Sequence, residues 1–215
     1  NHWLRGGTYG WHAARAGFAY IAWSNTISNM PPWGAVDKKL GNNPLIIAVP
    51  YDEQLSESFQ AIVLDMALSQ YSFGALEIRK QKGEQLPLPG GYDKNGNLTT
   101  DPAAIMESWR PLPIGYWKGA GLSLLLDILA TILSGGRSTA DISADNTERN
   151  LSQVFIAVDL SKLHNHTSIG QTLKRIIYDY HSATPAKTGD QIRYPGENIN
   201  AIRKQNLEKG VPVLQ

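Results

Sequence analysis

One apolar segment limits the possible folds of this chain more than any other feature. Between Gly121 and Gly135, leucine and isoleucine recur at positions i, i+3, i+4 and i+7, and most of the gaps are also apolar. This spacing predicts a helix over residues 122–133, and a helix that is apolar nearly all round is expected to be buried in a core. Asp127 interrupts the run and the apolar stretch covers only about 12 residues, which argues against a membrane span.

The residues that lead into this helix carry glycine and one positive charge. Gly119 and Gly121 remove side chains at the expected helix entrance, and Lys118 precedes them. A backbone without side chains lets a ligand approach closely, and a helix N-terminus favours anions. The pattern is typical either of a core helix with a solvated lysine or of a phosphate-binding entrance, and by itself it leaves both open.

Composition describes an ordinary globular protein and excludes several kinds of site. Of the 215 residues, 42% are hydrophobic and 18% charged, and 20 Lys and Arg against 19 Asp and Glu leave a net charge of +1. Because no long basic or acidic run occurs, we expect neither nucleic-acid nor membrane binding. The absence of cysteine excludes disulfides, cysteine-ligated zinc and thiol nucleophiles. The chain starts at Asn1 without an initiator methionine, and we expect it to be part of a longer protein.

Periodicity and turn residues predict strands and helices without a regular strand–helix alternation. We therefore expect an α+β or mixed α/β fold, in a single domain over residues 1–215. Residues 92–101 have the oxygen-rich spacing of a calcium loop, but Lys94 takes a ligand position and the closing glutamate is missing, so an exposed turn is favoured. Residues 137–150 are expected to form a polar connection. The predicted strands cover residues 18–24, 44–50, 61–65 and 153–159, and the predicted helices cover 9–16, 68–80, 103–107, 169–182 and 200–209.

Three histidines are considered for chemistry. His164 and His166 have a spacing that a metal could use, but no carboxylate cluster accompanies them, and we expect no metal site. His2 lies close to Arg5 and to two glycines, a setting that suits proton transfer to an anionic substrate, although a structural histidine is the simpler interpretation. No Gly-x-Gly-x-x-Gly follows a predicted strand and no Walker A motif occurs, so a Rossmann or P-loop nucleotide site is not supported.

Several motifs, in order along nearly the whole chain, resemble one enzyme family. They include Asn-His-Trp-Leu-Arg-Gly-Gly at residues 1–7, Met-Pro-Pro-Trp-Gly at 30–34, Leu-Asp-Met at 64–66 and Gly-Tyr-Trp-Lys-Gly-Ala-Gly at 115–121. These residues resemble the malate/L-lactate dehydrogenase-type oxidoreductases, which are unrelated to the Rossmann-fold malate and lactate dehydrogenases. Within that family, the pattern of Trp3, Arg5, Trp11 and Pro-Pro-Trp-Gly resembles the branch that reduces a diketo sugar acid.

The resemblance implies a fold and an activity. It implies a non-Rossmann mixed β-sheet flanked by helices, and NAD(P)H-dependent reduction of a 2-keto acid to a 2-hydroxy acid, with NADH expected in preference to NADPH. It also implies a cytoplasmic homodimer with a small-molecule substrate and the cofactor near the subunit interface. A malate, lactate or ureidoglycolate dehydrogenase of the same family is one alternative, and a non-catalytic module that binds a sugar acid or a nucleotide is another.

The resemblance also assigns candidate site residues. His2 matches a histidine that gives or takes the proton, and Lys118 is a second catalytic candidate, which orients the reacting groups or meets a cofactor phosphate. Arg5 is assigned to the substrate carboxylate on physical grounds alone, because a guanidinium can bind a carboxylate through two hydrogen bonds. The residues implied to bind the cofactor are Thr26, Ala61, Ile62, Val63, Leu64, Asp65, Met66, Ala67, Trp117, Lys118, Gly196, Glu197 and Asn198.

Three departures from the family pattern bear on these assignments. Family members carry an N-terminal helical region with a Ser-His-Gly motif, whose histidine is a second candidate acid, and these 215 residues do not contain it. The family's Gly-His-Glu reads Gly196-Glu197-Asn198 here, which affects the contact at Glu197. The polar segment of residues 51–60 is longer than the family pattern leads us to expect.

Overall fold

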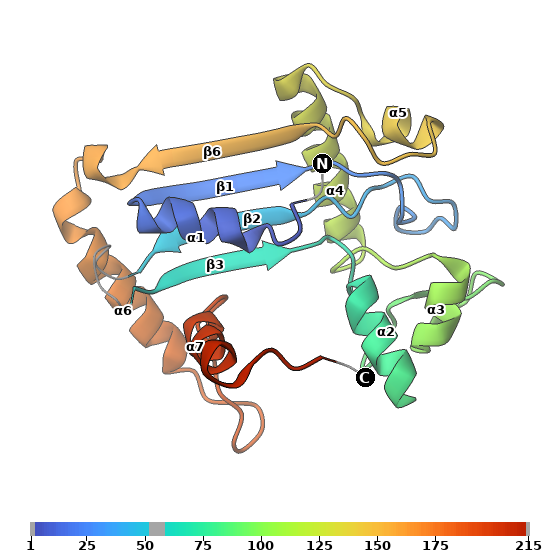
Figure 1. The fold of residues 1–215 in the computed structure, drawn as a ribbon. Coiled ribbons are helices and arrows are strands. Elements are labelled where there is room, and N and C mark those ends of the chain that lie inside the picture. Colours follow the sequence, from blue (N-terminus) through green and yellow to red (C-terminus); the bar gives the residue numbers. More distant parts are fainter. Residues whose placement is uncertain (1–2, 52–58, 214–215) are drawn as a thin grey trace. The chain divides into compact units, whose positions relative to one another are not determined.

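The computed structural model describes residues 3–51 and 59–213, and it separates into two compact units (Figure 1). Of the described residues, unit 1 comprises 3–4, 22–45 and 66–155, and unit 2 comprises 5–21, 46–51, 59–65 and 156–213. Each unit is described by itself. The expectation of a single domain stays a prediction.

Four strands form the main sheet, and all four follow the predicted ranges to within a residue at either end. The strands are β1 (Phe18–Ser24), β2 (Leu45–Pro50), β3 (Ala61–Met66) and β6 (Gln153–Asp159), in the order β3-β2-β1-β6. The amide of Asn25 donates to the carbonyl of Ser152, and that of Leu160 to the carbonyl of Gly17. Residue numbers along β6 rise from 152 to 160 while those of the bonded residues along β1 fall from 25 to 17, so β1 and β6 run antiparallel. The predicted fold class, an α+β protein with a helix-flanked sheet, is confirmed.

The apolar segment forms α4 (Trp117–Ser134), the longest helix of unit 1, and only one of its faces is buried. Leu126 and Ala130 pack in a core cluster with Trp23, Leu45 and other apolar side chains. The opposite face is open, and Ile132 exposes 65% of its surface. The prediction of a helix buried nearly all round is therefore wrong. Its physical reason is that the described residues of unit 1 form a core against one face and supply no second layer over the other.

The length and composition of α4 would also allow it to cross a membrane, since 18 residues reach a mean hydropathy of 1.3. Its hydrogen bonds to the rest of unit 1 are those of a helix packed within a folded unit. The indole Nε1 of Trp23 donates to the carbonyl of Leu126, and the Asp127 carboxylate accepts from Asn25 Nδ2 and the Thr139 amide. A core helix passes the same test of length and composition, and the expectation that the protein does not span a membrane stays a prediction.

Local capping explains where the other helices of unit 1 begin. Helix α2 (Phe73–Lys82) starts five residues later than predicted, because the Ser72 hydroxyl caps it by accepting from the Ala75 amide. Helix α5 (Thr139–Ala144) lies where a polar connection was predicted, and that prediction was wrong. A capping box between Ser138 and Asp141 stabilises this short helix, in a segment with too few apolar residues for a periodic signal. Helix α3 covers Pro102–Ser108.

The oxygen-rich loop forms the exposed turn that was predicted. The loop joins two short antiparallel strands, β4 (Gly91–Tyr92) and β5 (Leu98–Thr99). The Asp93 carboxylate accepts from the amides of Asn95 and Asn97, so it closes the turn. No group of potential metal ligands occurs among the described residues.

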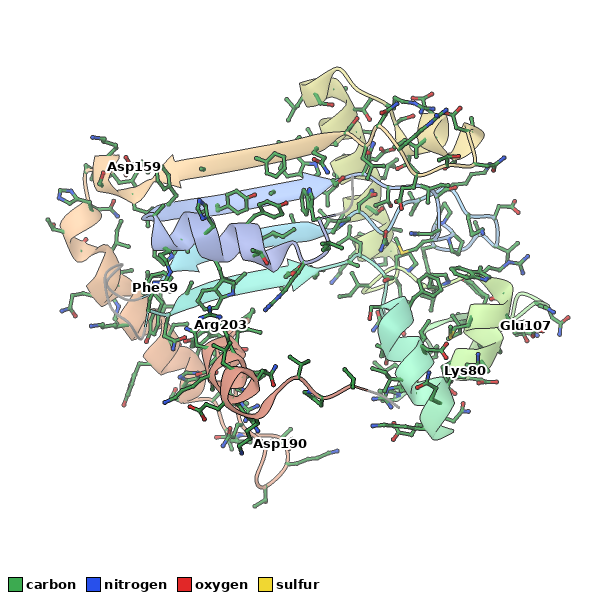
Figure 2. All side chains as sticks on the ribbon, in the orientation of Figure 1. Phe59, Lys80, Glu107, Asp159, Asp190 and Arg203 are labelled. Carbon is green, nitrogen blue, oxygen red and sulfur yellow. The ribbon has the colours of Figure 1, made fainter. Side chains whose placement is uncertain are left out.

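In unit 2, α1 (Gly7–Arg15) lies along β2 and β3 (Figure 1). A Cβ at Gly10 would lie 3.0 Å from the side chains of both Ile46 and Ala48, so glycine lets the helix approach the strand without displacing them. Phe59, labelled in Figure 2, is fully buried and meets the Trp11 ring at 6.2 Å and the Arg15 guanidinium at 4.7 Å. The remaining helices of the unit are η1 (Leu160–Lys162), η2 (His166–Ser168), α6 (Ile169–His181) and α7 (Ile199–Lys209).

Candidate active site

Three predicted site segments of unit 1 are linked by side-chain and backbone hydrogen bonds. The Thr26 hydroxyl donates to Asn42 Oδ1 at 3.1 Å, and the carbonyl of Asn42 accepts from the Leu68 amide, next to Ala67. The carbonyl of Leu68 in turn accepts from the Ile114 amide, just before the entrance to α4. The structure therefore brings the end of β3, the loop after β1 and the start of α4 together.

Thr26 is held inside this region and not at its surface. Its side chain is nearly buried, at 6% exposure, and its hydroxyl lies within hydrogen-bonding distance of the amide oxygens of Asn42 and Asn43. Asn43 Nδ2 donates to the carbonyl of Ser123, and the Ser123 hydroxyl donates to the carbonyl of Gly41, which ties the loop to α4. The contact of Thr26 with the cofactor stays a prediction.

The entrance to α4 is preorganised by strained backbone. Tyr116 precedes the helix at φ 60° and ψ −114°, a conformation that non-glycine residues rarely adopt, and it gives the helix no side-chain cap. Such strain persists only where surrounding structure enforces it, and it concentrates at functional sites. Gly119 packs directly against the backbone of Ile114, and Lys118 Nζ lies 5.8 Å from the centre of the Trp117 ring.

In unit 2, two predicted cofactor segments that are far apart in the chain lie side by side. The amide of Val63 donates to the carbonyl of Pro195 at 2.9 Å. Gly196 follows at φ 89°, and a Cβ there would lie 3.2 Å from the Val63 amide nitrogen. Glycine is needed both for this backbone conformation and for the close approach. The segment Gly196, Glu197 and Asn198 is thereby positioned against β3.

Asp65 connects β3 to the segment that carries Arg5. The Asp65 carboxylate is exposed, and its Oδ2 accepts from the Gly7 amide at the start of α1 at 2.7 Å. A side chain at Gly7 would crowd the same oxygen, so glycine permits the bond. Arg5, two residues earlier, is exposed in the same unit. The helix N-terminus therefore holds this carboxylate in place, and the role of Arg5 with the substrate stays a prediction.

Two features near the predicted residues were missed by sequence reasoning. The first is an apolar cavity in unit 1 beside Trp33 and Trp117. The Pro-Pro-Trp-Gly motif was a signal for it, but the motif alone did not indicate a cavity. The second is a pair in unit 2, in which His181 Nε2 lies 3.1 Å from Glu197 Oε1. No sequence pattern links these two positions, which lie in separate segments of the chain.

The three histidines that were considered for chemistry are not part of the site described above. His2, the predicted acid, lies outside the described residues. His164 and His166 are both exposed, and no metal-ligand cluster includes them within residues 3–51 and 59–213.

Each unit by itself offers groups that suit part of a nicotinamide dinucleotide. Unit 1 has exposed indole rings, which suit a flat base, and exposed lysines, which suit phosphates. Unit 2 has a backbone cradle at Gly196 and carboxylates at Asp65 and Glu197, which suit hydroxyl groups. Glu197 Oε2 is buried with no hydrogen-bond partner in the described structure, which marks an acceptor left for a ligand or water.

The sheet order and the helices around it set the fold, and comparison with known proteins identifies the family of the chain. Residues 1–215 match the family described as malate/L-lactate dehydrogenase, so the chain belongs to that family. The 2,3-diketo-L-gulonate reductase of Escherichia coli O6:K15:H31 (strain 536 / UPEC) is 44% identical to the chain over 214 residues, which is 99% of this chain and 62% of the relative.

Solved structures give the same result. The sulfolactate dehydrogenase from Methanocaldococcus jannaschii superposes with a TM-score of 0.81 at 27% identity, over 100% of this chain and 60% of that one. The malate dehydrogenase from Pyrococcus horikoshii OT3 gives a TM-score of 0.78 at 26% identity, over 99% of this chain and 58% of that one. The chain therefore spans less than two thirds of the length of these relatives.

Proposed function

We propose that the protein to which this chain belongs is a nicotinamide-dependent reductase that converts a 2-keto acid to a 2-hydroxy acid, with 2,3-diketo-L-gulonate as its substrate. The observation that carries the proposal is the 44% identity to a 2,3-diketo-L-gulonate reductase along 99% of the chain, because that match includes every predicted site segment. The side-by-side position of Val63 and Pro195 supports it, since both implied cofactor segments of unit 2 meet there.

The proposed roles of the residues follow from their chemistry. When bound, the cofactor supplies the hydride. His2 protonates the ketone oxygen, and Lys118 at the start of α4 orients the reacting groups through its positive charge. Arg5 binds the substrate carboxylate, for which its fixed fork of N–H donors is suited.

The activity is tested on the intact protein by following nicotinamide absorbance. We expect absorbance to fall when 2,3-diketo-L-gulonate is added with NADH, and to fall more slowly with a simple 2-keto acid such as pyruvate. A flat trace with the diketo acid and a falling one with pyruvate would overturn the substrate assignment. A flat trace with both acids and with both NADH and NADPH would overturn the reductase itself.

Two substitutions test the assigned residues. His2→Ala and Lys118→Ala should each lower kcat by about 100-fold, the loss typical of a missing acid or a positioned charge. Lys94→Ala is the matched control, because Lys94 is an exposed lysine that pairs with Glu107 at 2.7 Å on the surface turn. Wild-type rates in the first two variants would show that the site lies elsewhere.

We propose NADH as the preferred cofactor and the cytoplasm as the cellular location. Glu197 supports the first choice, since its unpartnered carboxylate oxygen suits a ribose hydroxyl better than a ribose phosphate. Titration of both cofactors into the intact protein tests the preference, and tighter binding of NADPH would contradict it.

We also propose that the protein is a homodimer and that the open face of α4 meets a second copy. This face carries large exposed side chains that include Leu125, Ile128 and Ile132. Apolar patches beyond about 300–600 Å² are rare on monomers, and a stable interface needs about 800 Å² from each partner. The exposed apolar side chains of this 18-residue helix can supply a large share of that area.

The dimer is tested by analytical ultracentrifugation. Ile132→Glu should shift the intact protein from dimer to monomer, because a charge would be buried without a partner. Leu207→Glu on α7 is the matched control, since Leu207 is an equally exposed apolar residue of unit 2. A monomeric wild type, or a dimer that survives Ile132→Glu, would contradict the proposal.

A further inference from the structure

The exposed turn between β4 and β5 contains a dipeptide with a reactivity of its own. Among the asparagines of the sequence, Asn95 alone is followed by glycine. The side-chain amide of an asparagine can be attacked by the backbone nitrogen of the next residue, and glycine leaves that nitrogen unhindered because it has no Cβ. Asparagine is for this reason one of the thermolabile residues of proteins. The turn is therefore a candidate site of covalent change, and this role is independent of the proposed reductase activity.

Asn95 is exposed and its side chain is free to react. Among the described residues, the Asn95 side chain has no hydrogen-bond partner, while its backbone amide donates to Asp93 Oδ1 at 2.8 Å. Asn97 is also exposed, but its Nδ2 donates to Asp93 Oδ2 at 3.3 Å and Leu98 follows it. Asn43 is fully buried and donates to the carbonyl of Ser123. Exposure, a free side chain and a following glycine coincide at Asn95.

The closed turn opposes the reaction. The attacking nitrogen would be that of Gly96, whose amide donates to the carbonyl of Asp93 at 3.1 Å. The Asp93 carboxylate also accepts from the amides of Asn95 and Asn97, both at 2.8 Å. Gly96 has φ 84°, the left-handed conformation typical of a three-residue hairpin turn. The N–H of Gly96 is thus directed at Asp93, and its nitrogen reaches the side chain of Asn95 when the turn opens.

The part of the turn that carries Asn95 and Gly96 depends on Asp93. The hairpin behind the turn is short, since β4 and β5 pair at two positions. Short two-stranded hairpins are marginally stable in water, and exposed loops open at a small fraction of the global free energy of unfolding. The Arg110 guanidinium holds the opposite part of the turn, where it donates to the carbonyls of Asp93 and Lys94. The Asp93 carboxylate is therefore the group that keeps Asn95 and Gly96 closed.

We propose that Asn95 is a site of slow covalent modification by deamidation, and that the Asp93 carboxylate sets the rate. The Gly96 nitrogen forms a bond to Cγ of Asn95, and the bond from Cγ to the side-chain nitrogen breaks. Ammonia leaves with the proton of the Gly96 amide, and a cyclic imide remains. Solvent water then opens the imide at either of its carbonyl carbons, which gives aspartate or isoaspartate. No group is oxidised or reduced.

Either product changes the turn. A new carboxylate raises the acidic residues from 19 to 20 against 20 Lys and Arg, so the net charge falls from +1 to zero. Isoaspartate also adds a main-chain carbon between residues 95 and 96, so the amides of Gly96 and Asn97 lose their fit to Asp93. Beyond the turn, the Ser108 hydroxyl still donates to the carbonyl of the buried Tyr92. We therefore expect the change to stay within the turn.

The modification is measured on the intact protein during incubation at mildly alkaline pH, well below the temperature of unfolding. Cleavage after glutamate releases residues 85–107 as one peptide, in which mass spectrometry distinguishes Asn95 from Asn97. We expect conversion at Asn95 with Asn97 unchanged, and faster conversion in a synthetic peptide of residues 85–107. Equal conversion of the two asparagines in the protein, or none at Asn95 after the peptide has reacted, would overturn the site.

Asp93→Ala tests the control of the rate. This variant should convert Asn95 about tenfold faster than wild type, because the closed turn loses hydrogen bonds to a charged acceptor. Glu107→Gln is the matched control and should leave the rate unchanged, since it breaks the surface ion pair with Lys94 at 2.7 Å and keeps the bonds of Asp93. The role of Asp93 is overturned by a wild-type rate in Asp93→Ala, by equal acceleration in both variants, or by equal rates in the wild-type protein and the peptide.

Discussion

The aromatic side chains beside the two candidate binding regions differ between the units. Trp33 and Trp117 of unit 1 are exposed around an apolar cavity, whereas Phe59 and Tyr194 of unit 2 are buried. Buried aromatic rings contribute their area to stability, while exposed rings held by neighbours have that area left for a ligand. Phe59 and Tyr194 therefore contribute to folding, whereas the rings of Trp33 and Trp117 keep their surface open.

The charged side chains also differ between the two units. In unit 2, one oxygen of Glu197 lies against His181 and one oxygen of Asp65 accepts from the Gly7 amide, so both carboxylates have a partner within the chain. In unit 1, Lys39 and Lys118 have no carboxylate partner among the described residues. Charges without partners beside an open cavity are typical of a site whose counter-charge arrives with the ligand. Three experiments would break or sharpen this comparison.

The largest effect is expected at Phe59. Phe59→Ala should lower the free energy of unfolding by about 4 kcal/mol, because it removes a fully buried ring and leaves a cavity beside Trp11. Denaturant unfolding followed by circular dichroism measures the loss. Trp33→Leu in unit 1 should cost about 1 kcal/mol or less, since its ring is exposed and loses mainly its contact with Tyr116. Similar losses in the two variants would remove the distinction between folding and binding aromatics.

A smaller effect is expected at the entrance to α4. Gly119→Ala should lower the free energy of unfolding by about 3 kcal/mol, because the new methyl group would collide with the carbonyl of Ile114 and overpack the turn. Gly121→Ala is the control, since open space surrounds that position and alanine favours a helix by about 1 kcal/mol. Thermal unfolding of both variants checks the pair. A stable Gly119→Ala variant would show that the entrance can relax, and would weaken the case that it holds Trp117 and Lys118 in place.

The smallest effect is expected at the cap of α5, where a charge of unit 1 does have partners. Hydrogen bonds from the Ser138 side chain and backbone lower the pKa of Asp141. A lowered pKa stabilises the folded state above the unfolded value of about 3.9 and is lost as the pH falls through the folded value. Ser138→Ala should therefore lower the melting temperature slightly at pH 7, and the difference from wild type should shrink below pH of about 4. A difference that does not depend on pH would exclude the carboxylate as its source.

The sequence predicts the sheet of this protein well because local pattern decides it. The strands at residues 18–24 and 153–159 are apolar runs bounded by turn residues, and both form with the predicted bounds. Helix α4 also forms, but its burial could not be predicted, since periodicity reports which side chains are apolar and not what covers them. Helix α5 was missed because its stability comes from two capping side chains and not from a periodic face.

The candidate site was predicted only where motifs resemble the family. The segments at residues 61–67 and 196–198 were implied by the resemblance, and the bond between Val63 and Pro195 brings them together. The cavity beside Trp33 could not be predicted, because its walls come from two segments whose approach depends on the packing of α4 against the loop at Gly41. The pairing of His181 with Glu197 depends in the same way on the course of the chain after α6.

Unit 2 is assembled from pieces that leave the ribosome at very different times. The Asn200 side chain donates to the carbonyl of Phe59 across 141 positions of sequence, and Val63 reaches Pro195 in the same way. Contacts of such separation close late, because the entropy of a long loop is lost before the contact is gained. During synthesis β3 must therefore wait for the last helices, and until they emerge its amides and Phe59 are exposed to chaperones and to misassociation.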